Sequence, residues 1–70
     1  MLPLVLAEPG QPQIIRKIGG SPEIKKHLED MGFTVGGEVS VVNAIGENLI
    51  VKVKDSRVAV SEELAKRIMI

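Results

Sequence analysis

The only histidine, His27, lies where two carboxylates can join it on one helical surface. Glu23 precedes it by four residues and Asp30 follows it by three, and side chains at these spacings are neighbours on a helix. His27 and Glu23 are therefore a weak candidate metal site. Structural metal sites usually have four cysteine or histidine ligands, so a solvated histidine beside Lys25 and Lys26 is the more frequent interpretation. Since the chain has no cysteine, we expect no tightly held metal and no cofactor.

Motifs for nucleophilic and phosphate chemistry are incomplete. Each of the four serines has a cap, strand or turn explanation, and none lies in a nucleophile motif. The Gly19-Gly20-Ser21 stretch at a helix start offers backbone amides to an anion, but no Gly-Lys-Ser/Thr sequence completes a P-loop. A chain of this size also needs its apolar residues for the core rather than for a deep cleft. We therefore predict that the protein is not an enzyme.

The composition disfavours nucleic acid and membrane partners. Nine basic and nine acidic residues give a formal net charge of zero, so no net field attracts nucleic acid. Phe33 is the only aromatic residue, whereas proteins that bind single strands or RNA stack bases on several aromatic rings. The apolar run at residues 1–7 has no charged n-region and is too short to span a bilayer. We predict a cytoplasmic protein without membrane insertion.

The pattern of apolar residues predicts one mostly β domain over residues 1–70. Nine valines and eight isoleucines favour strands, and residues 1–7 are expected to dock on the core as an edge strand. Further strands are predicted at residues 13–18, 38–45, 49–54, 57–60 and 67–70. About five short strands at this spacing indicate a small barrel, because closure hides the edges of so valine-rich a sheet.

A short helix is predicted between the first two main strands of this barrel. Ser21 is an N-cap residue and Pro22 occupies the first helical position. Ile24, Leu28 and Met31 form one apolar stripe, and the glycine at position 32 is placed at the left-handed C-terminal position. A single further helical turn is predicted after the serine at position 61.

Two features predict a surface for a protein partner. The first is a cluster of basic residues, namely Arg16, Lys17, Lys25 and Lys26. This cluster is either a solvated face or a docking patch for an acidic partner. Met31 and Phe33 are large apolar side chains only two positions apart, and they belong either to the core or to an exposed apolar patch of the kind that marks binding surfaces. The predicted partner-binding residues are Lys25, Lys26, Met31 and Phe33.

The sequence resembles the FeoA family, the small ferrous iron transport accessory proteins of bacteria. The matching stretches are residues 4–11, 14–20 and 28–34, Gly36 with Glu38-Val39, and residues 58–61 with Ala65 and Ile68. The most specific part is the leucine and Met31-Gly32-Phe33 run after the short helix. Two positions depart from the family pattern: His27 stands where Arg or Lys is usual, and Val35 where Pro is common.

The resemblance implies an SH3-like β-barrel with a short inserted α-helix and a short C-terminal helical turn. It also implies a regulatory, cytoplasmic role in iron homeostasis, through protein contact with the GTP-binding domain of the FeoB transporter. The alternative is a stand-alone SH3-like module that serves a metal-dependent transcriptional repressor. An iron carrier with its own transition metal site is a third class, and a weak homo-oligomer is compatible with the sequence. With one aromatic residue, the chain cannot build the polyproline groove of true SH3 domains.

Overall fold

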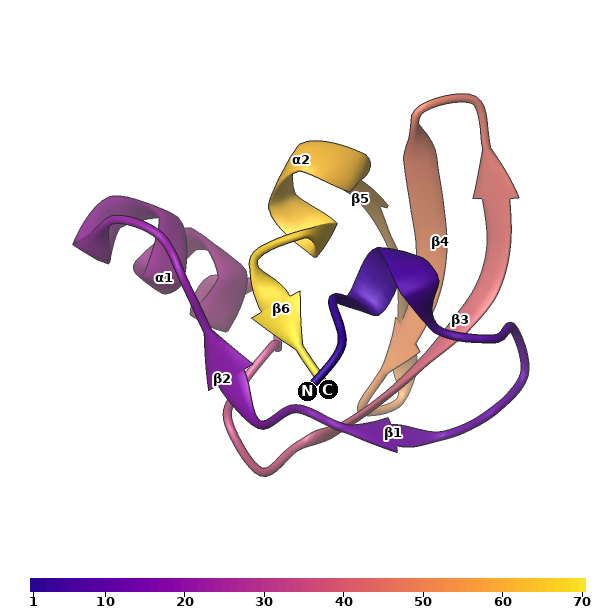
Figure 1. The fold of residues 1–70 in the computed structure, drawn as a ribbon, viewed down its shortest axis with the longest axis horizontal. Coiled ribbons are helices and arrows are strands. Elements are labelled where there is room, and N and C mark those ends of the chain that lie inside the picture. The colour runs from indigo at the N-terminus through magenta and orange to yellow at the C-terminus, as the bar shows by residue number, and fades with distance from the viewer.

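Three consecutive antiparallel strands form the centre of the fold (Figure 1). The structure is a computed structural model that describes residues 1–70. Strands β3 (Glu38–Ile45), β4 (Asn48–Val53) and β5 (Ser56–Ser61) are joined by two-residue turns. Alternate residues of β4 are buried, namely Leu49, Val51 and Val53, as expected for a strand with one face on the core. The strands predicted at residues 38–45, 49–54 and 57–60 are therefore confirmed.

The remaining elements are short strands, which complete two separate sheets, and helical segments. In chain order they are η1 (Leu4–Leu6), β1 (Gln13–Ile14), β2 (Lys17–Ile18), α1 (Pro22–Asp30), α2 (Glu62–Ala65) and β6 (Ile68–Met69). A four-stranded sheet has the order β1-β3-β4-β5, and β2 pairs with β6 in a two-stranded sheet. The fold is a small SH3-like β domain with an inserted helix, as predicted. The sheets do not form one continuous ladder, so the barrel is only partly closed.

Both ends of α1 have the predicted capping chemistry. The Ser21 hydroxyl accepts a hydrogen bond from the Ile24 N–H at 3.3 Å. At the other end, Gly32 has φ +104°. The Gly32 N–H donates to the Glu29 carbonyl and the Phe33 N–H to the Leu28 carbonyl, both at 2.9 Å, which is the Schellman pattern. The helix therefore ends because Gly32 adopts a left-handed conformation that returns the chain to the core.

The core consists entirely of apolar side chains. Phe33, Leu4, Ile15, Leu28 and Ile68 are its largest fully buried members. The other buried residues are Ile18, Val39, Val41, Leu49, Val51, Val53, Val60, Ala65 and Ile70. No polar side chain is buried, so burial of apolar surface is the main source of stability in this domain.

The edge strand predicted at residues 1–7 is wrong for residues 4–6, and only Leu2 and Pro3 pair with the C-terminal residues. Leu4–Leu6 form the single 3₁₀ turn η1, in which the Leu6 N–H donates to the Pro3 carbonyl at 3.0 Å. Pro3 forms only an isolated bridge to Met69. The turn places Leu4 fully in the core and leaves Leu6 exposed. Burial of Leu4, together with packing of Val5 and Ala7 against the core, favours this conformation.

The single strand predicted at residues 13–18 is divided into β1 and β2. The Ile15 N–H donates to the Gly37 carbonyl at 2.9 Å, whereas the next N–H, of Arg16, donates to the Met69 carbonyl at 2.7 Å. The chain therefore leaves the four-stranded sheet and enters the two-stranded sheet between these two residues. Burial of Ile15 stabilises this crossing point.

The two chain ends lie side by side (Figure 1). The Leu2 N–H donates to the Ile70 carbonyl at 2.9 Å, and the Ile70 N–H donates to the Leu2 carbonyl at 2.8 Å. The longest helix, α1, has nine residues, and none of the helices has the length and apolar character needed to cross a bilayer.

Candidate partner-binding surfaces

The outer face of α1 presents two of the predicted partner-binding residues. Leu28 is buried and Ile24 is half-buried, and these two fix the orientation of the helix. Lys25 and Lys26 are consequently exposed. Figure 1 shows α1 at the side of the molecule, away from β3 and β4. We call the exposed lysine pair together with Met31, which follows the last residue of α1 on the side of the apolar stripe, the α1 face.

Met31 and Phe33 have different environments, although only Gly32 separates them. Phe33 is 0 % exposed and belongs to the core, so the prediction that its side chain contacts a partner is wrong. The Schellman turn returns the chain toward the sheet immediately after Gly32, and this directs Phe33 inward. Met31 is half-buried and packs against the core from outside. It stays a candidate for contact at the edge of the α1 face.

A basic residue from the far end of the sequence lies near the start of α1. The Gly19 N–H donates to the Arg67 carbonyl at 2.7 Å, and the Arg67 side chain passes close to Gly20. Sequence reasoning missed Arg67 because the pairing of β2 with β6 is not local. Gly20 has φ +103° and the Ser21 hydroxyl already caps the helix. Gly20, directly before the N-cap, thus has a structural explanation.

The structure brings no third ligand to the weak candidate metal site. Glu23 and His27 are both exposed on α1. No group of three or more histidine, aspartate or glutamate side chains is close enough to hold a metal ion. The arrangement lacks the closed ligand set of a structural metal site.

We expect that the protein binds Fe(II) no more tightly than an ordinary pair of surface groups. The exposed carboxylates favour hard ions such as Mg, Ca or Mn, and a single imidazole adds only one ligand that suits iron. Anaerobic calorimetry with Fe(II) should therefore give no stoichiometric submicromolar site, and His27→Ala should give the same weak heat as the unaltered protein. A submicromolar site that disappears in His27→Ala would contradict this prediction and support the iron carrier.

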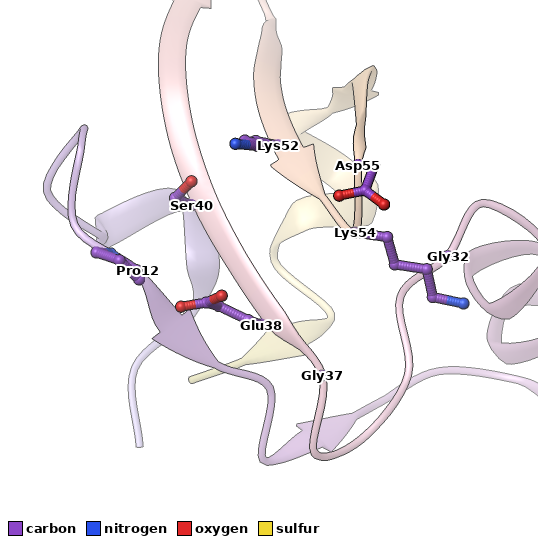
Figure 2. Close-up of a pocket in the computed structure, with 8 residues that line it drawn as sticks. All are labelled: Pro12, Gly32, Gly37, Glu38, Ser40, Lys52, Lys54 and Asp55. Atoms are coloured by element: carbon purple, nitrogen blue, oxygen red, sulfur yellow. The ribbon is translucent and has the colours of Figure 1, made fainter.

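A shallow polar groove lies between the end of α1 and the central sheet (Figure 2). Its volume is about 320 Å³. The residues that line it are Pro12, Gly32, Gly37, Glu38, Ser40, Lys52, Lys54 and Asp55. Figure 2 shows Glu38 on β3 and the Lys54-Asp55 pair on opposite sides of the groove. Ser40 lies directly opposite Lys52 in the register of β3 and β4, and no hydrogen bond joins these two side chains.

Almost all charged side chains of this protein lack an ionic partner. The single ion pair joins Lys66 and Glu63 at 3.9 Å, on the exposed surface. Lys25 and Lys26 on α1 and the lysines of the groove therefore make no ion pair. Surface cations without an ion pair can bind an acidic protein without first breaking an ion pair within their own chain.

Comparison with known proteins gives consistent matches over the whole chain. A family model described as the FeoA domain matches residues 2–70. A relative from Methanocaldococcus jannaschii, named as an Fe(2+) transport protein A, is 30% identical over 70 residues, which is 100% of this chain and 85% of that protein.

Solved structures are similar over nearly the same extent. A crystal structure named Iron Uptake Regulatory Protein (FeoA) has a TM-score of 0.88 at 31% identity, covering 96% of this chain and 89% of that one. The solution structure of iron(II) transport protein A from Clostridium thermocellum has a TM-score of 0.90 at 26% identity, covering 97% of this chain and 43% of that one. These likenesses agree with the partly closed barrel and its inserted helix.

Proposed function

Because the chain belongs to the FeoA family of ferrous iron transport proteins, we propose that it is a cytoplasmic accessory protein that regulates a FeoB-type transporter. It acts by binding the cytoplasmic GTP-binding domain of that transporter. The match of the family model over residues 2–70 is the observation that supports this most strongly. The protein has no catalytic role in this proposal.

The proposed contact is the α1 face. Interfaces derive affinity from apolar anchors at their centre and use charges at the rim to steer the encounter. Met31 supplies the apolar part, and Lys25 and Lys26 supply positive charge for an acidic partner. Because neither lysine packs on the core, their charge can be changed without loss of the fold.

The double variant Lys25→Glu with Lys26→Glu should associate with the soluble domain of the transporter at least about tenfold more slowly at low salt. The replacement reverses the charge that steers the encounter, so the salt dependence of the rate should also decrease. Stopped-flow or surface-based kinetics at two ionic strengths measures both quantities. A thermal melt checks that the fold is intact.

The control is Lys66→Glu, which makes the same charge change as each single lysine replacement but lies next to α2. Its association rate should stay within about twofold of the unaltered protein, because distant exposed charges are screened. If the double variant binds at an unchanged rate while Asp55 or Arg57 variants abolish binding, the contact does not involve α1. If pull-down from cytoplasmic and membrane fractions recovers a metal-dependent repressor instead of the transporter, the repressor module is the correct function.

A further inference from the structure

The central sheet has two edges, and they differ in how their backbone groups are satisfied. In the order β1-β3-β4-β5, β5 has β4 as its only strand neighbour. On the other side, β1 pairs only with the first two residues of β3, Glu38 and Val39. The rest of β3 is therefore a second free edge. Free edges present unpaired N–H and C=O groups that can accept another strand.

The free part of β3 is blocked by groups of the protein itself. The Gly10 N–H donates to the Val41 carbonyl at 2.8 Å. The Asn43 side-chain oxygen accepts the Ala44 N–H, also at 2.8 Å. The register with β4 shifts between Val41 and Asn43, which marks a bulge. Bulges and local hydrogen bonds of this kind are the usual protection of an edge strand.

The edge of β5 has no such protection. The two-residue turn Lys54-Asp55 closes the hairpin on the pair Val53–Ser56, and the pair that flanks such a turn is hydrogen-bonded. Bonded and non-bonded pairs alternate along an antiparallel ladder. Arg57 and Ala59 therefore belong to non-bonded pairs, and their N–H and C=O groups point away from β4.

No other group of the protein takes up these backbone donors and acceptors. The hydrogen bonds outside the regular strands and helices do not include residues 56–60. The Arg57 and Ala59 side chains are also exposed, so the face of the sheet that they share is open to solvent at those positions. The strand contains no proline and no bulge.

The charges beside this edge indicate the chemistry of a matching segment. Arg57 lies directly opposite Lys52 in the register of β4 and β5. Side chains of a non-bonded pair approach closely, and like charges placed directly opposite are destabilising. Neither cation has an ion pair within the protein. A carboxylate beside Arg57 would offset this repulsion.

We propose that the free edge of β5 binds an extended acidic segment of a partner protein, which adds to the central sheet as a further strand. The main chain of the segment bonds to the outward groups of Arg57 and Ala59. One of its acidic side chains lies beside Arg57, on the face of the sheet that also presents Lys52. An apolar side chain two positions away lies beside Ala59, on the same face as the half-buried Ile50, because every second residue of a strand shares a face.

The probe for this site is the peptide acetyl-Ser-Thr-Glu-Thr-Leu-Thr-Ser-amide, with its glutamate and leucine two positions apart. Amide NMR of the full chain at low salt should show shifts and slower hydrogen exchange at Arg57 and Ala59, with none at Ala44. A control peptide with Lys in place of Glu should bind at least about tenfold more weakly, as should the probe to Arg57→Glu. Arg57→Glu with the lysine peptide should recover binding, because the charges are then exchanged.

Four results would overturn the proposal. The first is that the Arg57 and Ala59 amides do not respond to the probe, and the second is that the lysine peptide binds the unaltered protein equally well. Concentration-dependent shifts at these amides without peptide would show that a second copy of the chain occupies the edge. Tighter binding of single-stranded DNA there would assign it to nucleic acid. None of these measurements uses the transporter, so failure here is separate from failure of the α1 contact.

Discussion

Phe33→Ala is expected to remove most of the unfolding free energy of the protein. Phe33 is the only aromatic residue and is 0 % exposed in a core of 14 buried side chains. Truncating a buried phenylalanine to alanine typically costs about 3–5 kcal/mol of unfolding free energy. A domain of this size has a total stability near the low end of about 5–15 kcal/mol. Urea titration followed by far-ultraviolet circular dichroism measures the loss, since the chain contains no tryptophan or tyrosine.

Two controls distinguish the loss of packing from a general sensitivity of this region to substitution. Phe33→Leu keeps most of the buried volume and should cost less than half as much as Phe33→Ala. Val35→Ala lies two residues later at a side chain that is 65 % exposed, and it should change stability by less than about 0.5 kcal/mol. If Phe33→Ala unfolds at the same urea concentration as the unaltered protein, Phe33 is not a core residue and becomes a partner contact again.

Local chemistry explains why α1 and the hairpins were predictable from the sequence. Ser21 and Pro22 determine where the helix begins, and Gly32 determines where it ends. Both signals act within a few residues, so no knowledge of the tertiary fold is needed. The alternation of Leu49, Val51 and Val53 likewise identifies β4 and its buried face.

The elements that were predicted wrongly depend on contacts between distant residues. The crossing at Ile15 and Arg16 requires Gly37 and Met69 as hydrogen-bond acceptors, and neither is near residues 13–18 in the sequence. The conformation of residues 1–7 similarly depends on a core that can bury Leu4. A short apolar run is compatible with a strand or a helical turn, and only tertiary packing distinguishes the two.

The exposed positions of charged side chains were predictable from the sequence. The direction of the Schellman turn and the position of the open strand edge were much less so. The exposed positions of Lys25 and Lys26 follow from the apolar stripe of α1, since that stripe fixes which side faces the core. The choice between Met31 and Phe33 depends on the direction of the Schellman turn. The open edge of β5 is visible only when the strand order is known, because any of the three central strands could be the edge.

Gly32→Val should lower the melting temperature by about 10–20 °C. The φ of +104° at Gly32 lies well beyond the left-handed well near +57° that other residues occasionally adopt. The strain costs about 1–3 kcal/mol, and in a domain of this size each kcal/mol lowers the melting temperature by about 4–8 °C. A Cβ at this position would lie 3.6 Å from the Val53 side chain, so the branched methyls of valine have little room.

Gly46 is the matched control, because it also has positive φ but in a different setting. Its φ of +59° is close to the centre of the left-handed well, and a Cβ there would meet nothing within 4 Å. Gly46→Ala should therefore lower the melting temperature by only about 5 °C, and Gly32→Ala should lower it more. The comparison of the two alanine variants isolates backbone strain from the bulk of valine. Equal melting temperatures for these variants would mean that α1 does not end in the Schellman turn, and the inward direction of Phe33 would lose its explanation.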